Sequence, residues 1–431
     1  MARDRAFAVE DLVNWMADQR ALSDWRLTVK RSDTQEYFFI RRQLDMRRAK
    51  NVEKFDLVLY RDFEEKGEFY RGLYQLSLHP TLSFSEAKTM IEKGIESAKF
   101  LKNPYFPIPE ESRVKGFETT QTSAFAAEVY LNALFDGMED PEGGINSCEI
   151  VFENVTTSIR NSRGVFVSFT SPRIFAEVVL DWKGEREEVE LIEYLHAQTV
   201  DADSVRKEMS QKRYLVQERA KARPTRSARE HPVVLSREAV GEFLSYYAFQ
   251  TSAESVYQKS SLAQPGRPIQ GMNPTGDLLT LTMVPILENN PNSCLYDQEG
   301  SFLEPLTVIR EGEVRELWGE RRFTFYLGRQ ATGYYPLMKV GPGTMTREDL
   351  RERSAVEVAR FSDFQIDPLT GDFAGEIRLG WQNGHPVTGG SLSGNIHKVE
   401  TSMRFSNETM RIEKGEFPAF LYLENLDISG Q

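Results

Sequence analysis

The sequence predicts an α+β protein, with an N-terminal domain of two helix–strands–helix units around a mixed sheet and a β-rich C-terminal domain with a few helices. Two observations predict this fold. Segments with helical spacing of apolar residues flank groups of strand-like runs, and this pattern occurs twice in the first two hundred residues. Beyond residue 232 the sequence pattern changes to short apolar runs separated by turn residues. A chain of 431 residues is also long enough for two or three domains.

The first unit begins with a helix predicted over Val9–Gln19, where the apolar residues are spaced for one helix face. A second helix is predicted to start near Ser85, as its N-cap, and to run towards Leu101. The proline-rich residues 103–111 cannot continue it. Between the two helices we expect the strands Trp25–Lys30, Tyr37–Leu44, Phe55–Arg61 and Phe69–Leu76.

The second unit repeats this order. A helix is predicted over Thr122–Phe135, and another long helix is expected to open at Asp203 and to continue into a basic stretch. Between them we expect the strands Ile145–Phe152, Val165–Thr170, Ile174–Trp182 and Val189–His196. The two units have negligible sequence identity, so the repeat is inferred from the pattern of elements alone.

A linker is predicted over residues 222–232, which are charged, short of large apolar side chains and closed by prolines. This places an N-terminal α+β domain over residues 1–221 and a C-terminal β-rich domain over residues 233–431.

The C-terminal domain is expected to consist of short strands with a few helices. Helices are predicted over Arg237–Ala248 and from Thr346, which has Asp349 three residues on. The final apolar run, 417–428, predicts a strand pair or one long strand. Turns are predicted at Glu311-Gly312, at Pro368–Gly371 and at Asn383-Gly384, the last a pair that favours tight hairpins.

Composition narrows the range of functions. The formal net charge of −12 argues against a protein that coats nucleic acid, because phosphate contacts need a basic face. Cys148 and Cys294 are the only cysteines, too few for a disulfide framework or a cysteine-based metal site. The N-terminal segment has acidic residues where a signal peptide needs an apolar core, and no apolar run approaches the ~20 residues that span a membrane. We therefore expect a cytoplasmic protein.

The segment LSREAVGEFL, Leu235–Leu244, has the form of a zinc-peptidase helix without its metal ligands. Such helices carry two histidines and a glutamate that activates a metal-bound water. Glu238 is present here, but Arg237 and Glu242 stand where histidines would. Arginine cannot ligate a cation, and two carboxylates without a nitrogen ligand bind hard ions only weakly. On an ideal helix the two positions point about 140° apart, so they converge only if Gly241 permits a distortion.

Several short sequence motifs of the C-terminal half follow one another in a distinctive order. They are VVLSREAVGEFL (233–244), the D-x-E-G turn Asp297–Gly300, DPLTGDFAGEIRLGWQNG (367–384) and GGSLSGN (389–395). In this order and spacing they resemble the TldD/PmbA peptidase family of bacteria and archaea, formerly called modulators of DNA gyrase. With the double N-terminal unit, the resemblance covers nearly the whole chain. ATGYY, Ala331–Tyr335, departs from the family's usual S-T-G-N.

The resemblance implies the PmbA branch of the family, also called TldE. In the TldD branch a His-Glu-x-x-x-His helix binds zinc, its glutamate acts as the base, and a cysteine near the C-terminus completes the site. The PmbA branch lacks that motif, as this chain does at Arg237, Glu238 and Glu242. The resemblance therefore implies a non-catalytic subunit of a metallopeptidase complex in peptide processing, inactive alone. This chain is expected to bind no cofactor, because zinc belongs to the partner.

The expected partners follow from the same resemblance. The protein partner is a TldD-like subunit, or a second copy of this chain in a dimer. The other partner is an unfolded peptide. We expect it to bind as an added strand, because backbone hydrogen bonds recognise an extended chain regardless of its sequence. Neither nucleic acid nor a membrane is expected as a partner.

Two other functions stay open. One is a homodimeric peptide-binding or scaffolding protein without hydrolysis. The other is a divergent active peptidase that uses Glu238, Glu242 and a distant histidine. Two interpretations oppose this peptidase hypothesis. Glu238 is interpreted as a salt-bridged helix residue, and Arg237 as a partner of nearby acidic side chains rather than a binding group for a peptide carboxylate. No two of the five histidines lie four residues apart, which favours structural roles for His79, His196, His231, His385 and His397.

Overall fold

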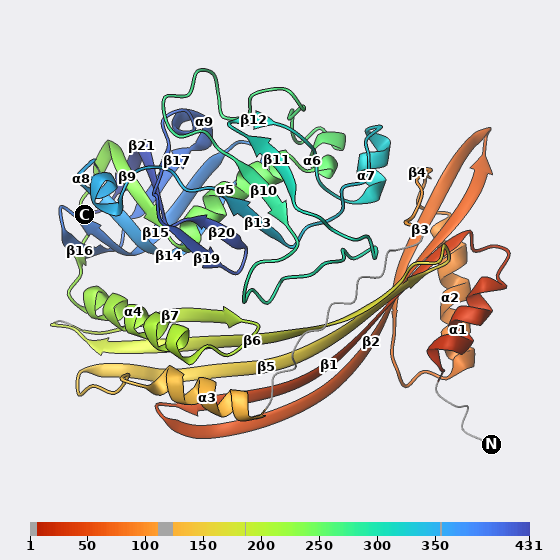
Figure 1. Cartoon of the computed structure of the whole chain (residues 1–431), viewed down its shortest axis with the longest axis horizontal. Coiled ribbons are helices and arrows are strands. Elements are labelled where there is room, and N and C mark those ends of the chain that lie inside the picture. Colours follow the sequence, from red (N-terminus) through yellow and green to blue (C-terminus); the bar gives the residue numbers. More distant parts are fainter. Residues whose placement is uncertain (1–6, 111–123, 186, 354–355) are drawn as a thin grey trace.

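The computed structural model describes residues 7–110, 124–185, 187–353 and 356–431, and it confirms the α+β fold class. One seven-stranded sheet forms the N-terminal domain, and a six-stranded and an eight-stranded sheet form the C-terminal domain. In Figure 1 the N-terminal sheet is a long curved layer, and the C-terminal domain lies above one end and the middle of it.

The N-terminal sheet has the strand order β4-β3-β2-β1-β5-β6-β7, and its pairings are antiparallel. The strands are β1 (Asp24–Ile40), β2 (Gln43–Glu65), β3 (Glu68–Leu78), β4 (Asn103–Pro104), β5 (Gly143–Asn161), β6 (Phe166–Lys183) and β7 (Glu188–Ala197). The first long strands of the two units, β1 and β5, pair side by side at the centre. This arrangement agrees with the repeat expected from the sequence.

Each unit holds three long strands rather than the four short ones expected. The runs Trp25–Lys30 and Tyr37–Ile40 are parts of β1, because the polar residues between them stay in the paired ladder. The turn that ends β1 lies at Arg41, with φ 54°, so Leu44 already belongs to β2. In the same way, Val167–Thr170 and Ile174–Trp182 are both parts of β6.

Four helices cover one face of this sheet, and two of them begin earlier than expected. The N-cap of the second helix is Ser83, not Ser85, because Ser83 and Glu86 form a reciprocal capping box. Asp201, not Asp203, caps the fourth helix. Thr122, in the helix predicted over Thr122–Phe135, lies outside the described residues. The helices are α1 (Val9–Ala17), α2 (Phe84–Ala98), α3 (Ala124–Phe135) and α4 (Ala202–Ala220).

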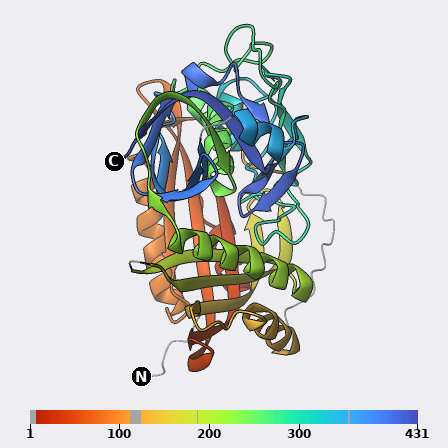
Figure 2. The ribbon, with the colours of Figure 1, turned by 90° about the vertical axis from the view of Figure 1, so that its left-hand side faces the viewer.

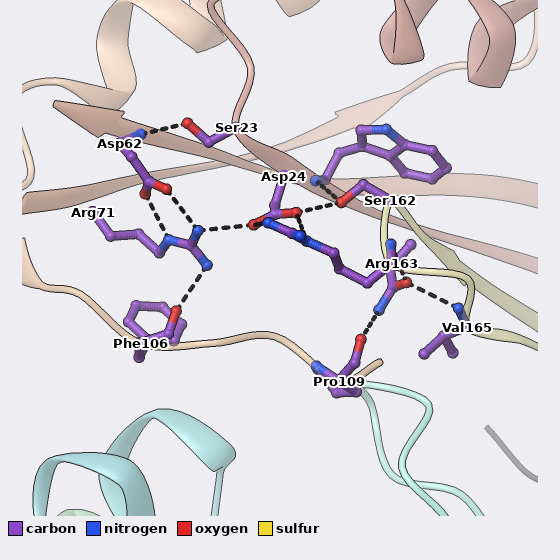
Figure 3. Close-up of polar contacts among 11 residues, drawn as sticks. Ser23, Asp24, Asp62, Arg71, Phe106, Pro109, Ser162, Arg163 and Val165 are labelled. Atoms are coloured by element: carbon purple, nitrogen blue, oxygen red, sulfur yellow. Dashed lines mark hydrogen bonds and ion pairs between the residues drawn. The ribbon is translucent and has the colours of Figure 1, made fainter. Parts of the chain in front are cut away.

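A buried network of ion pairs around Arg71 holds the segment that follows α2 against the sheet (Figure 3). The guanidinium of Arg71 is fully buried and donates to Asp24 at 2.8 Å, to Asp62 at 2.7 Å and to the backbone carbonyl of Phe106 at 2.7 Å. Arg163, from the β5–β6 turn, donates to the other oxygen of Asp24 at 2.6 Å. Every group in this network has a partner of opposite charge or a hydrogen bond, as burial of charge requires.

The C-terminal sheets enclose the central helix α5 (Glu238–Gln250), which is buried along most of its length. The six-stranded sheet has the order β12-β11-β10-β13-β20-β19, and the eight-stranded sheet follows the order β14-β9-β21-β17-β15-β16-β8, with β18 paired to β21. The strands are β8 (Arg223–Pro224), β9 (Ala228–Ser236), β10 (Leu281–Val284), β11 (Leu306–Arg310), β12 (Glu313–Val314), β13 (Leu337–Val340), β14 (Val356–Ile366), β15 (Asp372–Gln382), β16 (His385–Thr388), β17 (Ser391–Asn395), β18 (Arg404–Phe405), β19 (Thr409–Ile412), β20 (Gly415–Pro418) and β21 (Phe420–Ser429). The other helices are α6 (Ala253–Tyr257), α7 (Arg321–Tyr326), α8 (Arg347–Arg353) and α9 (Ile396–Val399).

The predicted turns of this domain are found. Glu311 and Gly312 have φ values of 50° and 75°, and Asn383 and Gly384 have 51° and 76°, the left-handed pairs that close tight hairpins. The final run splits into β20 and β21, which lie in different sheets.

The segment predicted as a linker, 222–232, does more than connect the two domains. It contains β8 and the start of β9, which pair with β16 and β21. Residues 223 to 232 are thus largely built into the C-terminal sheet.

The two domains are in contact along α4 and along one loop of the C-terminal domain. Helix α4 packs on β6 and β7 and also touches β15 and β16, and in Figure 2 it lies between the N-terminal strands and the C-terminal domain. The D-x-E-G turn projects to the N-terminal sheet, where Tyr296 joins Ile159 and Val167 in one apolar cluster. None of the described helices combines the length and apolar character needed to cross a lipid bilayer.

Candidate functional site

Arg237, Glu238 and Glu242, the three positions that we call the motif, begin at a sharp corner between β9 and α5. Arg237 was expected on the helix, but it is the N-cap, with φ 58° and ψ −128°, and the helix starts at Glu238. A positive φ is strained for a residue with a side chain, and such strain persists only where the surroundings enforce it. Here the strand enters the corner fully buried, and the backbone N–H of Arg237 donates to the carbonyl of Ala419 at 3.4 Å.

The structure brings Arg237, Glu238 and Glu242 to the wall of one cavity of about 490 Å³, which lies between the two domains. We call it the interdomain cavity. Its walls are the end of β7, the start of α5, residues 288–291, residues 359–364 around β14, and residues 411–414 of the β19–β20 hairpin. The motif therefore faces a space that a ligand can enter.

Glu238, the residue at the position of a catalytic glutamate, is held by two cations. Its carboxylate lies 3.2 Å from Arg360 Nη1 and 3.8 Å from Arg237 Nε. Burial within the cavity walls would raise the pKa of Glu238, but Arg360 and Arg237 outweigh it and hold this pKa below its ordinary value. The side chain still has 59% of its surface exposed, towards the cavity. Glu238 is therefore an ionised partner of arginine.

Arg360 belongs to a larger ion cluster that joins the two domains. From β14, its guanidinium forms two hydrogen bonds with Glu193 of β7, Nε to Oε1 at 2.8 Å and Nη2 to Oε2 at 2.7 Å. Lys212 of α4 donates to the same carboxylate at 3.1 Å and lies 3.3 Å from Glu208. Burial would raise the pKa of Glu193, but Arg360 and Lys212 hold it at about 2. We call Arg360, Glu193, Lys212 and Glu238 the ion cluster.

Glu242 is occupied by a different cation. Lys414, from the β19–β20 hairpin, donates to its carboxylate. Gly241, which was expected to permit a distortion of the helix, has another role. A Cβ at this position would lie 2.4 Å from Ile412 Cδ1, so the glycine allows the hairpin to approach the helix. No ion pair joins Arg237 to Glu242 within the part of the chain that the structure describes.

One of the five histidines reaches the interdomain cavity. His196, at the end of β7, lines it and lies with Nε2 3.7 Å from Glu413. His397 contacts Glu400 and Tyr246 instead, at 3.5 and 3.4 Å. The described residues contain no group of three or more His, Cys, Asp or Glu side chains placed to hold a metal ion.

The donor set at the motif does not fit the zinc that the family's TldD branch would hold there. Zinc sites need at least three protein donors with their lone pairs free. The two carboxylates of the motif, Glu238 and Glu242, are both bound to cationic side chains, and Arg237 adds a further positive charge. Cys148 and Cys294 offer no substitute, since burial raises the pKa of each thiol.

The sequence identified the three motif positions but not the other residues of the ion cluster that surrounds Glu238. Glu193, Lys212 and Arg360 come from three elements separated by 19 and 148 residues. Two signals for them are present in the sequence. One is a single arginine inside the apolar start of β14, and the other is a lysine four residues after Glu208 on a helix.

Comparisons with known proteins agree with the fold and with the family resemblance. Residues 228–430 match the family described as the PmbA/TldA metallopeptidase C-terminal domain. The comparison with curated proteins found no match.

Among solved structures, TldE from Thermococcus kodakarensis is similar with a TM-score of 0.77 and 15% identity, over 98% of this chain and 100% of that one. A Thermotoga maritima protein described as a modulator of a DNA gyrase has a TM-score of 0.74 and 15% identity, over 97% and 99% of the two chains. One from Bacteroides thetaiotaomicron has 0.75 and 18%, over 98% and 99%. At such identities these likenesses establish the fold of the whole chain.

Proposed function

Through its C-terminal domain the chain belongs to the PmbA/TldD family, and on this premise we propose that it is a PmbA/TldE-like, non-catalytic subunit of a peptide-processing metallopeptidase complex in the cytoplasm. A TldD-like partner would supply zinc and hydrolysis. This chain would complete the chamber that holds the peptide.

The observation that carries this proposal is the contact of Arg360 with Glu238. A general base needs a carboxylate that can accept a proton from a positioned water. Arg360 donates a hydrogen bond to the carboxylate of Glu238, Arg237 lies 3.8 Å from it, and both place positive charge where a metal would have to sit. Arginine does not release its proton at any pH at which proteins fold, so the site has no neutral state in which a metal could replace it.

The interdomain cavity supports a role in holding peptide. Strand β19 is the last strand of the six-stranded sheet, and its residues Arg411 and Ile412 form part of the cavity wall. A strand at a sheet edge can pair with an extended peptide through backbone hydrogen bonds. The proposed ligand is thus an unfolded peptide, and the proposed contact is one that does not depend on its sequence.

The test is to combine the purified chain with a TldD-like subunit and to follow both complex formation and peptide hydrolysis. We expect one stable complex in size-exclusion chromatography, hydrolysis by the complex, and none by this chain alone. If the two proteins elute separately at micromolar concentration, the proposal fails. Hydrolysis that depends on Glu238 of the isolated chain would also overturn it.

One observation favours a second candidate, the divergent peptidase. His196 lies in the same cavity as Glu238 and Glu242, so the distant histidine that such an enzyme requires is present. Glu413 already contacts this ring at 3.7 Å, and both glutamates are bound to cations. A His196→Ala variant that abolished hydrolysis by the isolated chain would support the second candidate over the first.

A further inference from the structure

A second cavity, which the proposed function does not use, lies over the N-terminal sheet. We call it the sheet cavity. It has a volume of about 520 Å³ and lies between the strands β1, β2, β3, β5 and β6 and the loop 292–298 of the C-terminal domain. Leu27 and Val29 of β1 pack under α1 and α2, so the alternating Arg26, Thr28 and Lys30 face the other way, into this cavity.

The lining of the sheet cavity is polar and includes two cationic side chains that form no ion pair among the described residues. Three cationic side chains line it: Arg26, Lys30 and Arg173. Arg26 lies 3.5 Å from Glu299, whereas Lys30 and Arg173 are exposed and form no ion pair within the described part of the chain. Glu153 is directly across from Arg173 in the β5–β6 register, but the contact of its carboxylate is with Thr34.

The acidic groups of the lining have partners of their own. Asp56 accepts a hydrogen bond from Ser77. Asp297 accepts from the backbone N–H groups of Glu299 and Ser301, both at 2.9 Å, and its pKa is raised because it is buried. Neither carboxylate contacts Lys30 or Arg173. The hydroxyl groups of Thr28, Thr157 and Ser171 add neutral hydrogen-bonding partners.

The spacing of the cations indicates the shape of their ligand. Arg26 and Lys30 are four residues apart on β1, which is about 13 Å along a strand. Arg173 pairs with Glu153, which pairs with Thr34 of β1, so it lies two strands across and four residues along from Lys30. That separation is roughly 16 Å between Cα atoms. One phosphate or one carboxylate cannot span such distances, whereas an extended chain with several anionic groups can.

From this geometry we propose that the sheet cavity is a binding site for acidic segments of an extended peptide, with Arg26, Lys30 and Arg173 as the partners of its carboxylates. The inference rests on the proposed function, since it specifies a class of peptide for the same complex. It gives this subunit a part in substrate selection that needs no catalytic residue. Opposite charges across such a cavity raise the association rate and the preference for one ligand more than they raise bulk affinity.

The test uses fluorescence anisotropy with the full chain and labelled peptides of alternating Glu and Gly, with an amidated C-terminus. Peptides of alternating Gln and Gly, amidated or with a free C-terminus, separate side-chain carboxylates from the terminal one. We expect the Glu peptide to bind at least about tenfold more tightly than the amidated Gln peptide, a difference of ~1.4 kcal/mol. This preference should shrink as salt is added, because screening weakens contacts between exposed charges.

The variant Lys30→Gln/Arg173→Gln should remove most of the preference, and both side chains are exposed, so the fold is retained. Lys207→Gln/Arg310→Gln is the matched control, with two exposed cations on α4 and β11. Equal binding of Glu and Gln peptides, no change in the Lys30/Arg173 variant, or full competition by inorganic phosphate would each overturn the inference. Complex formation with the TldD-like subunit is measured on the same variants. If the wild-type chain forms no complex, the proposed function is wrong. If the complex forms but the preference for acidic peptides is absent, only this inference is wrong.

Discussion

The guanidinium of Arg360 lies 2.7 Å from the carboxylate of Glu193, and this contact joins β14 of the C-terminal domain to β7 of the N-terminal domain. The same guanidinium lies 3.2 Å from Glu238. One side chain thus contacts both domains and forms an ion pair with the glutamate at the position of a catalytic base. Arg360 therefore contributes both to the docking of the domains and to the cationic surroundings of the motif glutamate.

Replacement of Arg360 by methionine should destabilise the protein strongly. Glu193 is 3% exposed and would keep Lys212 as its one cationic partner among the described residues. Removal of one member of a buried ion cluster costs about 3–5 kcal/mol, because the other charge stays buried. Arg360→Lys should recover only part of this loss, since an ammonium group cannot bond both carboxylates in the planar geometry of arginine. The measurement is the free energy of unfolding in urea.

The control for this loss is Arg31→Met, which breaks the ion pair between Arg31 and Glu53 on the surface of β1 and β2. Exposed pairs contribute at most about 1 kcal/mol. If both variants lose the same small amount, the ion cluster does not hold the domains together.

The stability of the protein should fall as pH rises from about 4.5 to 7, through Glu299. Burial raises the pKa of Glu299 to about 7, with a smaller contribution from Asp297, and Arg26 opposes the shift. Because the folded pKa is above the unfolded one, the contribution to stability is complete below the unfolded pKa and is lost as pH passes the folded pKa. A shift of this size corresponds to about 3 kcal/mol. Glu299→Gln should remove this part of the pH dependence. Parallel stability curves for the two proteins between pH 5 and 8 would contradict the assignment.

Gly300→Ala should loosen the contact of the D-x-E-G turn with the N-terminal sheet. Gly300 has φ +83°, and a Cβ there would lie 2.6 Å from Val165 Cγ1. Gly266→Ala is a matched control, because Gly266 has φ +81° and no neighbouring atom within 4 Å of a Cβ. Both variants carry the backbone strain of about 1 kcal/mol. Only Gly300→Ala adds the clash, so we expect a further loss of about 1–3 kcal/mol. Equal melting temperatures of the two variants would count against tight packing at this turn.

The double substitution Arg237→His/Glu242→His should not create a zinc site. Residue 237 lies before the helix at φ 58°, and Arg360 still holds Glu238. Two imidazoles at these positions therefore do not converge on the carboxylate. Elemental analysis after dialysis is expected to give substoichiometric zinc. A full equivalent of zinc per chain would mean that the local geometry, rather than the residue types, allows the TldD arrangement.

Local signals in the sequence predicted the turns and helices well. The left-handed pairs Glu311-Gly312 and Asn383-Gly384 lie at the hairpins as expected, because their conformation is set by two adjacent residues. Strand lengths were less predictable. The first ten residues of β2 are exposed on both faces, so no alternation of apolar and polar residues marks them as a strand.

The candidate site was predictable only in its first part. The helix with Arg237, Glu238 and Glu242 could be read from one segment, although the positive φ of Arg237 could not, since it depends on how β9 enters the corner. The pairing of Arg360 with Glu193 depends on the docking of two domains. No local pattern encodes such a contact. The sheet cavity likewise needs β1, β6 and the loop 292–298 in one place.

The most direct test of the central claim is the zinc content of the purified chain, measured alone and in complex with a TldD-like subunit. With Arg360 and Arg237 on Glu238, and Lys414 on Glu242, we predict no zinc above background in the isolated chain and stoichiometric zinc in the complex. Stoichiometric zinc in the isolated chain, lost in a Glu238→Gln variant, would contradict the account.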